Sequence, residues 1–166
     1  MTIYAHNLPS PLGQLTAAAR AEGLIGLWFE DQRYAPDASQ WRPEAKHPDL
    51  RAAADWIEEY FAGGRPEYCG RLLLEGTEFR LWVWNRLLKI SYGLSATYGA
   101  LRDQFVAENG RQMSARAVGG AVGHNPVSLI IPCHRVVGAG DNLTGYGGGL
   151  ERKRALLALE REGRQT

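Results

Sequence analysis

The hydrophobic and polar positions in the first half of the chain predict strands followed by a helix. Two apolar runs, 13–19 and 23–30, are separated by a Glu-Gly pair, a combination typical of a β-hairpin. The polar segment 31–47 contains two prolines and predicts a loop. Apolar residues then recur at helical spacing over 49–64, where Gly63 is a suitable helix end.

The second half predicts short helices, after one more candidate strand over 71–76. Each helix is preceded by a hydroxyl residue that can accept a hydrogen bond from the free N–H groups of the first turn. The predicted caps and helices are Thr77 with 78–90, Ser95 with 96–108, and Ser114 with 115–123. The last two, joined by a short glycine-containing connection, form a candidate helix-turn-helix. A final helix follows a glycine-rich stretch and is expected to end at Gly163.

The helix predicted over 115–123 has two contrasting faces. One face is apolar and consists of Val118, Ala121 and Val122. The other face carries one long side chain and three glycines, namely Arg116, Gly119, Gly120 and Gly123. Each glycine costs a helix about 1 kcal/mol relative to alanine. Such a face suits the close approach of something bulky. A nucleic-acid backbone and a neighbouring helix of the same protein are the two candidates.

Length, charge and cysteine content narrow the class of protein. The 166 residues suit one large domain or two small ones, and we place two domains at 1–75 and 76–166. Residues 1–74 carry 7 basic and 10 acidic side chains and the remainder 12 and 8, so only the second part is basic. A polyanionic partner and an ordinary solvated surface both explain this balance. No apolar run is long enough to span a membrane, and the amino terminus does not resemble a signal peptide. With two cysteines and no zinc-ligand spacing, we expect a cytoplasmic protein without a zinc site.

Cys133 is the candidate reactive residue. It lies between a proline and a His-Arg pair, directly after the apolar run Leu129–Ile131. A lone cysteine is commonly a small buried hydrophobe, but nearby cations or an acid–base partner convert a thiol into a nucleophilic thiolate. His134 is adjacent in sequence and can reach the thiol through a water molecule. Glu160, which projects from the apolar face of the last helix, can orient that histidine or, alternatively, extend outward to solvent.

An ordered set of motifs gives a family resemblance. The segments IPCHRVVG and LTGYGGGLERKRALL resemble the active-site region of the O6-alkylguanine-DNA alkyltransferases. These proteins are also called methylated-DNA–protein-cysteine methyltransferases. Their recognition helix, asparagine hinge and acceptor cysteine resemble SARAVGGAVGHNPVSLIIPCHRVV, and the start of the same domain resembles GTEFRLWVWNRLLKISYG. SPLGQL and GLIGLWF match the amino-terminal domain more loosely. The resemblance covers most of residues 9–160.

The resemblance implies an α+β fold and a partner. The fold is a small amino-terminal α/β domain of ribonuclease-H-like topology followed by a helical, winged-helix-like domain with a helix-turn-helix. That domain binds the minor groove of alkylated double-stranded DNA and flips the damaged guanine, because the alkylated oxygen is out of reach in a paired duplex. Arg116 aligns with the finger that fills the gap in the base stack, Tyr98 with the tyrosine that presses on the phosphate, and Asn125 with the hinge. The remaining expected DNA-binding residues are Ala115, Gly119 and Gly120.

The resemblance also implies the chemistry. Cys133 attacks the alkyl carbon on guanine O6, His134 removes the thiol proton through water, and Glu160 holds the histidine. In the alkylguanine pocket, Tyr146 donates to the departing guanine, the Val136 carbonyl reads its amino group, and the Gly147 N–H reaches the reacting oxygen. The substrate is mainly O6-methylguanine, with O4-methylthymine as a further candidate. The resemblance implies that no metal or organic cofactor takes part. Because the thioether product has no good leaving group, each protein molecule is consumed after one reaction. The protein is expected to be a monomer that binds DNA either alone or cooperatively.

The chain departs from the family pattern at a few positions. Leu94 stands where a glutamate is usual, the segment between Tyr98 and Arg116 is about four residues longer, and Gly147 replaces a serine of some members. The loss of that hydroxyl suggests a pocket open to bulkier alkyl groups. Two other classes remain: a binder of alkylated DNA that performs no repair, for which an intact Cys133 is unnecessary, and a cysteine hydrolase, which would regenerate Cys133.

Overall fold

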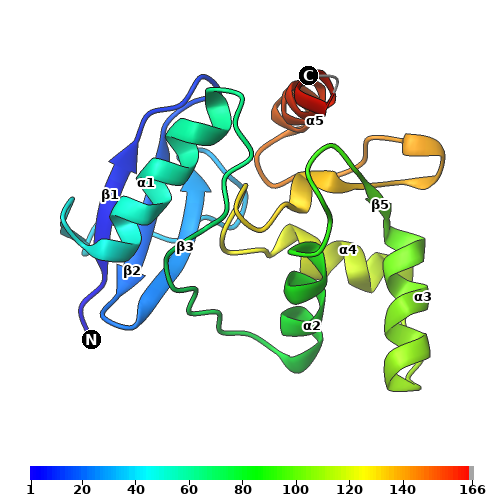
Figure 1. The fold of residues 1–166 in the computed structure, drawn as a ribbon. Helices are drawn as coiled ribbons and strands as arrows, with labels where there is room; N and C mark the ends of the chain where they lie inside the picture. Colours follow the sequence, from blue (N-terminus) through cyan, green and yellow to red (C-terminus); the bar gives the residue numbers. More distant parts are fainter. Residues whose placement is uncertain (165–166) are drawn as a thin grey trace. The chain divides into compact units, whose positions relative to one another are not determined.

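The computed structural model describes residues 1–164 and divides into two compact units (Figure 1). The first unit comprises Met1–Glu75 together with Pro126–Ile130, a segment that we had counted with the carboxy-terminal domain. The second runs from Gly76 to Asn125 and from Ile131 onward. In the described part of the chain, no helix combines the length and apolar character needed to cross a membrane.

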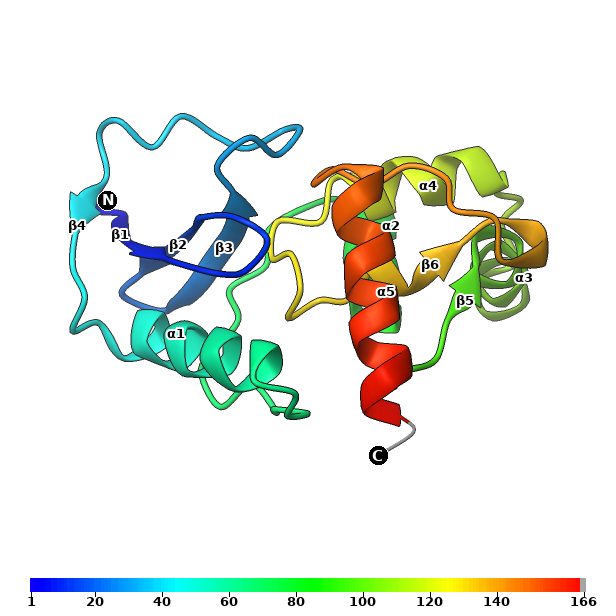
Figure 2. The ribbon, with the colours of Figure 1, turned by 90° about the horizontal axis from the view of Figure 1, so that it is seen from above.

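The first unit is built on a four-stranded sheet with the order β3-β2-β1-β4 (Figure 2). Its strands are β1 (Tyr4–Leu8), β2 (Leu15–Arg20), β3 (Gly23–Phe29) and β4 (Arg42–Pro43). β2 pairs antiparallel with β1 and β3, which confirms the predicted hairpin, and β4 runs parallel to β1. The sequence pattern did not reveal β1, whose residues are mostly half-buried and alternate only weakly, or the two-residue β4 within the predicted loop.

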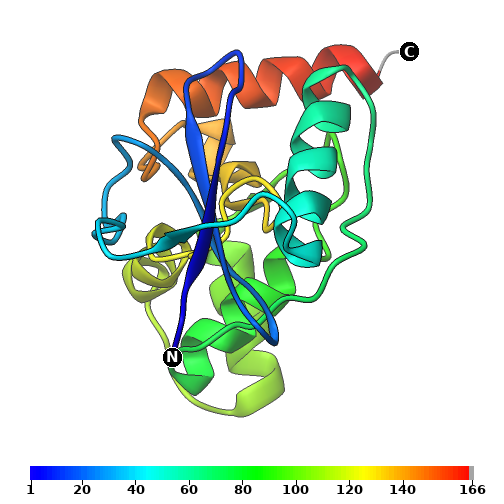
Figure 3. The same ribbon diagram turned by 90° about the vertical axis from the view of Figure 1, so that its left-hand side faces the viewer.

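Helix α1 (Pro48–Phe61) packs along one side of this sheet, which Figure 3 shows nearly edge-on. The predicted helix is confirmed, because its apolar stripe is the buried face; the buried members include Leu50, Ala53, Ile57 and Tyr60. Gly63 adopts the left-handed backbone (φ 95°) that only glycine occupies at little cost, directly after the helix. Burial of this stripe fixes α1 to the sheet.

Two distant segments complete the edge of β3. The segment predicted as a strand at 71–76 forms only one isolated bridge, Leu24 with Leu72, so that prediction is wrong. From the second half of the chain, Pro126 O accepts a hydrogen bond from Leu27 N at 2.8 Å, and Ser128 N donates to Leu27 O at 3.0 Å. An edge strand with unpaired amides invites aggregation. Residues 126–128 therefore cap part of the sheet edge just before the chain reaches Cys133.

The second unit consists of short helices around a two-stranded ladder (Figures 1 and 2). In chain order, its elements are α2 (Glu78–Leu87), β5 (Ala96–Thr97), α3 (Tyr98–Asn109), α4 (Ala115–Gly123), the 3₁₀ turn η1 (Cys133–Arg135), β6 (Val136–Val137), the 3₁₀ turn η2 (Ala139–Asp141) and α5 (Leu150–Arg164). β5 and β6 pair in parallel. α4 packs against both α2 and α3, so the predicted pair of helices forms.

The helix starts follow the predicted caps at two of three places. Thr77 and Ser114 accept hydrogen bonds from the first turns of α2 and α4, as predicted. The predicted cap Ser95 is wrong, because the chain stays extended through β5 and Thr97 caps α3. Pairing of β5 with β6 is a long-range contact that the local pattern does not reveal.

The predicted end of the last helix is also wrong. α5 continues through Gly163 to Arg164. Gly163 is instead a site of close packing, since a Cβ atom there would collide with the hydroxyl of Tyr92. That hydroxyl donates to the Leu159 carbonyl at 3.5 Å, so Tyr92 holds the carboxy-terminal half of α5 against the segment that follows α2.

The cap assignment predicts a stability difference. Replacing Thr97 with valine keeps the β-branched shape that suits β5 but removes the hydroxyl that accepts from Ala100 N at 3.0 Å. We expect Thr97→Val to lower the free energy of unfolding by about 1 kcal/mol. Ser95→Ala, at an exposed position, should change it by less than about 0.5 kcal/mol. Urea denaturation measures both, and the opposite ranking would contradict the assignment.

Candidate functional site

A tight turn places Cys133 at the centre of the second unit. The chain turns at Pro132, and the Cys133 N–H donates to Ile131 O at 2.8 Å as the 3₁₀ turn η1 begins. The Asn125 side chain donates to the same carbonyl at 2.8 Å. Asn125 and Ile131 lie on either side of the segment that caps β3, so this bond ties the end of α4 to the start of the cysteine turn. The expected hinge residue thus occupies a position where it joins both elements.

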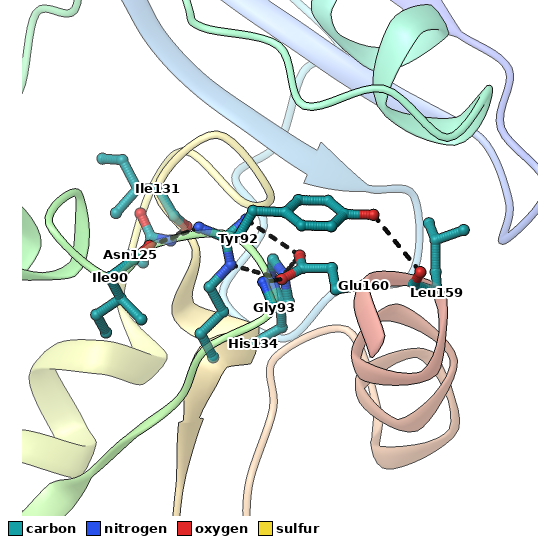
Figure 4. Close-up of polar contacts among 9 residues, drawn as sticks. Ile90, Tyr92, Gly93, Asn125, Ile131, His134, Leu159 and Glu160 are labelled. Atoms are coloured by element: carbon teal, nitrogen blue, oxygen red, sulfur yellow. Dashed lines mark hydrogen bonds and ion pairs between the residues drawn. The ribbon is translucent and has the colours of Figure 1, made fainter. Parts of the chain in front are cut away.

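The carboxylate of Glu160 is the main anchor of the site (Figure 4). It is 1% exposed and receives four hydrogen bonds from three residues, two on η1 and one in the turn at Gly93. They come from His134 Nε2 at 2.6 Å, Arg135 Nε at 2.8 Å, Arg135 Nη2 at 3.2 Å and Gly93 N at 3.0 Å. The alternative of a glutamate extended to solvent is therefore wrong. A buried carboxylate this well bonded fixes η1, α5 and the turn at Gly93 to one another.

The charge states of Glu160 and His134 follow from this arrangement. Burial opposes ionisation of Glu160, but the hydrogen bonds and charges of His134 and Arg135 outweigh it and hold the pKa of the carboxyl well below its usual range. Burial lowers the pKa of His134, and Glu160 offsets this only in part. The folded protein at neutral pH therefore combines an ionised Glu160 with a neutral His134. A neutral imidazole is the form that can accept a proton.

The thiol of Cys133 is enclosed by polar groups from several elements. The residue is 6% exposed, and burial raises the pKa of its thiol, whereas a hydrogen bond from Asn125 and the charge of Lys153 lower that pKa. Tyr146 is close enough for its hydroxyl and the thiol to shift each other's pKa. Within residues 1–164, the buried Tyr146 hydroxyl forms no hydrogen bond of normal geometry. An uncompensated buried hydroxyl suits a site where a substrate supplies the partner.

Helix α4 presents its glycine face to open space. Val118, Ala121 and Val122 are buried, as predicted. Apart from the helix's own backbone, no heavy atom of residues 1–164 would lie within 4 Å of a Cβ atom added at Gly120 or at Gly123. At Gly119 the nearest atoms belong to Tyr98, 3.8 Å away. The explanation of this face by close packing against another helix of the chain is therefore wrong for Gly120 and Gly123. The glycines leave room for a partner outside the protein.

The other predicted site residues lie in the same unit. Ala115 and the exposed Arg116 begin α4, and Tyr98 begins α3, where its hydroxyl donates to Thr144 O at 3.1 Å. Val136 is buried on β6, and Gly147 lies in the loop before α5. In the described residues, no three side chains of metal-ligating type are grouped together.

Two charged residues of the site were not singled out from the sequence. Arg135 is 9% exposed and contacts Glu160, and its Nη1 donates to Ile90 O at 2.6 Å. Lys153 is fully buried beside the loop that carries Tyr146. Both lie within the motifs that gave the resemblance, but an arginine or lysine in a sequence is normally read as a solvated surface residue. Only the fold reveals that these two are enclosed.

Known proteins resemble this chain over both units. Residues 3–68 match the ribonuclease-like domain of 6-O-methylguanine DNA methyltransferase, and residues 78–162 match its DNA binding domain. The methylated-DNA–protein-cysteine methyltransferase of Mycobacterium bovis is 45% identical over 159 residues, which cover 96% of this chain and 93% of that protein. Its counterpart in Methanosarcina acetivorans is 41% identical over 162 residues, or 95% and 98% of the two chains. The crystal structure of Mycobacterium tuberculosis OGT in complex with DNA has a TM-score of 0.86 at 44% identity, covering 96% and 94%.

The chain combines a ribonuclease-like domain with a DNA-binding domain, and the latter carries a buried cysteine surrounded by polar groups. This combination defines a class of cysteine-dependent alkyltransferases. With both domains matched over most of the chain, the protein belongs to the methylated-DNA–protein-cysteine methyltransferase family. The predicted family, the mixed α and β fold class and the enzyme class are confirmed.

The buried carboxylate predicts a specific pH dependence of stability. Because the pKa of Glu160 is lowered on folding, its contribution is complete above about pH 5 and is lost as the pH falls towards the folded pKa. We expect Glu160→Gln to lower the free energy of unfolding by about 3 kcal/mol at neutral pH. This difference from wild type should shrink by about 1.4 kcal/mol per pH unit below about pH 4.3.

Urea denaturation at several pH values measures this difference. The matched control is Glu162→Gln, at an exposed position on the same helix, which should change stability little at any pH. A Glu160→Gln penalty that stays constant between neutral and acidic pH would contradict a lowered carboxyl pKa.

Proposed function

We propose that this protein repairs DNA by transferring the alkyl group of O6-alkylguanine irreversibly to Cys133. The observation that carries the proposal is the enclosed constellation of Cys133, His134 and Glu160, in a domain whose neighbouring helix leaves its glycine face open. Family membership makes alkyl transfer to a cysteine the expected chemistry, and Cys133 is the buried one of the two cysteines, Cys69 being exposed. The carboxy-terminal domain binds DNA and accepts the alkyl group, and residues 1–75 serve as scaffold.

The first step is loss of the thiol proton. His134 uses Nε2 for its bond to Glu160, so Nδ1 is the nitrogen that takes the proton, through a bridging water. The ionised Glu160 stabilises the imidazolium that forms. The thiolate then attacks the alkyl carbon, so that the S–C bond forms as the C–O bond to guanine breaks.

The leaving guanine carries the electron pair of the broken bond and needs hydrogen-bond donors. The buried hydroxyl of Tyr146 donates to it, and the backbone N–H of Gly147 reaches its oxygen. The Val136 carbonyl accepts from the exocyclic amino group, which distinguishes guanine from adenine. The thioether that remains on Cys133 has no good leaving group, so each molecule reacts once.

The open glycine face is the proposed contact with DNA. α4 enters the minor groove, where Gly119 and Gly120 allow close approach of the backbone and Ala115 lies at the start of the helix. Arg116, exposed on the same helix, fills the space left by the flipped base. Tyr98, one helix away and next to Gly119, presses on the phosphate of the flipped nucleotide. One protein molecule acts on one lesion.

Mass spectrometry of the intact protein tests the reaction. After incubation with duplex DNA that carries one O6-methylguanine, the protein should gain the mass of one methylene group, located on Cys133, and stop at one equivalent. Cys133→Ser should bind the same DNA without any gain. The matched control, Cys69→Ser, should react like wild type.

Two other outcomes would indicate a different function for the protein. Binding without any mass gain would identify a binder of alkylated DNA that performs no repair. Conversion of more than one equivalent of substrate per protein, with Cys133 unmodified afterwards, would identify a hydrolase. Either result would overturn irreversible alkyl transfer.

The glycine face gives a second test. In Gly120→Ala, the new methyl group meets no protein atom, so the helix should gain about 0.5–1 kcal/mol of stability. The same methyl group should weaken duplex DNA binding several-fold, because it separates α4 from the groove. Thermal unfolding and fluorescence anisotropy measure the two effects. Greater stability with unchanged DNA affinity would contradict the placement of this face on DNA.

A further inference from the structure

Lys153 is a buried cation that the proposed mechanism leaves without a task. It lies in the first turns of α5 and is 0% exposed. Its Nζ donates to the carbonyls of Thr144 at 2.9 Å and Gly145 at 3.1 Å. Within residues 1–164, it forms no ion pair with any carboxylate. An ammonium buried with only carbonyl partners is costly, so its place in this site calls for a compensating function.

The carbonyls that Lys153 contacts belong to the loop that carries Tyr146. The Thr144 carbonyl also accepts from the Tyr98 hydroxyl at 3.1 Å, and the ammonium lies 5.8 Å from the centre of the Tyr98 ring. Arg152, the preceding residue of α5, donates to Gly148 O of the same loop at 3.1 Å. The start of α5 and the start of α3 therefore fix the backbone on both sides of Tyr146.

The charge of Lys153 also acts on the reactive thiol. The electrostatic interaction between Lys153 and Cys133 lowers the pKa of the thiol and raises that of the ammonium, while burial lowers the pKa of Lys153 to about 8. The other ionisable groups around this pair are His134 on η1, Tyr98 on α3 and Tyr146 in the loop. Beyond them lie Arg152 and the ionised Glu160, which act on Tyr146. Glu160 is already bonded to Arg135, so the Cys133 thiolate is the anion that the buried ammonium of Lys153 is placed to balance.

We propose that Lys153 is a positioning residue of the transfer site, whose ammonium fixes the Thr144–Gly145 backbone and supplies the positive charge that favours the Cys133 thiolate. It acts through Cys133 and the loop, and the proton leaves the thiol by way of His134 as before. This inference rests on the proposed role of Cys133 as the alkyl acceptor.

The test titrates the thiolate directly, without DNA. Thiolate absorbs in the ultraviolet, and the difference between a protein and its Cys133→Ser counterpart isolates the signal of Cys133. Lys153→Met keeps the length of the side chain and removes its charge. We expect it to raise the titration midpoint of Cys133 by about one pH unit, a fall of about tenfold in the thiolate fraction near neutral pH.

The matched control is Arg154→Met. It removes the same charge from the adjacent, exposed position of α5 and should leave the midpoint almost unchanged, because an exposed charge is screened by solvent. A midpoint that is the same in wild type and Lys153→Met would overturn the proposal. So would a rate of methyl transfer that falls by the same factor below and above both thiol midpoints, because a shifted midpoint lowers the thiolate fraction only at pH values below them.

A second measurement covers the case in which Lys153→Met does not fold. The chain has three lysines, Lys46, Lys89 and Lys153, so carbon-13 labelling of lysine gives a spectrum in which each can be titrated by NMR. Coupling is reciprocal, and Cys133→Ser should therefore lower the midpoint of Lys153 and leave the other two unchanged. An unchanged Lys153 midpoint would overturn the proposal. Failure of wild type to accept a methyl group, with this coupling present, would count against the proposed function instead.

Discussion

The buried carboxylate of Glu160 is the interaction on which the second unit depends. It satisfies donors from the turn at Gly93 and from both His134 and Arg135, so removal of this one side chain would leave a guanidinium and an imidazole buried without their anion. Breaking a buried ion pair in this way costs far more than the pair contributes when intact. The same four bonds that hold α5 in place keep Glu160 ionised, while burial keeps His134 neutral although Glu160 offsets that effect in part. In this unit, stability and chemistry rest on one group.

A second constraint comes from the short path between α4 and Cys133. Asn125 and Ile131 are tied by a hydrogen bond, while the residues between them extend to the edge of β3. Leu129, in the middle of this path, has a φ of 72°, a backbone conformation that costs a non-glycine residue about 1 kcal/mol or more. Its side chain is fully buried, so packing holds the backbone in that conformation. Burial of Leu129 and the bond between Asn125 and Ile131 thus each hold part of this path in place.

Local sequence patterns predicted the parts of this protein that local forces determine. The hairpin, α1 and the caps Thr77 and Ser114 follow from periodicity and from side chains that bond their own helix. The errors arise where a distant segment decides the outcome, as with β5, whose pairing with β6 moves the start of α3 to Thr97. Within the site, the residue pattern and then the resemblance pointed to Cys133, His134 and Glu160. Lys153 and Arg135 were missed, because burial of a cation is a property of the tertiary structure.

The capping of β3 by residues 126–128 has a consequence for how the chain folds during synthesis. Amino-terminal domains usually fold first, as they leave the ribosome. Here the edge of the first sheet stays open until some fifty further residues have been made, since Leu27 receives its partners from Pro126 and Ser128. A fragment ending at residue 75 would expose that edge, and a fragment starting at 76 would carry apolar side chains of Val127 and Leu129 with no strand to cover them. The two units are therefore distinct in structure but inseparable as polypeptides.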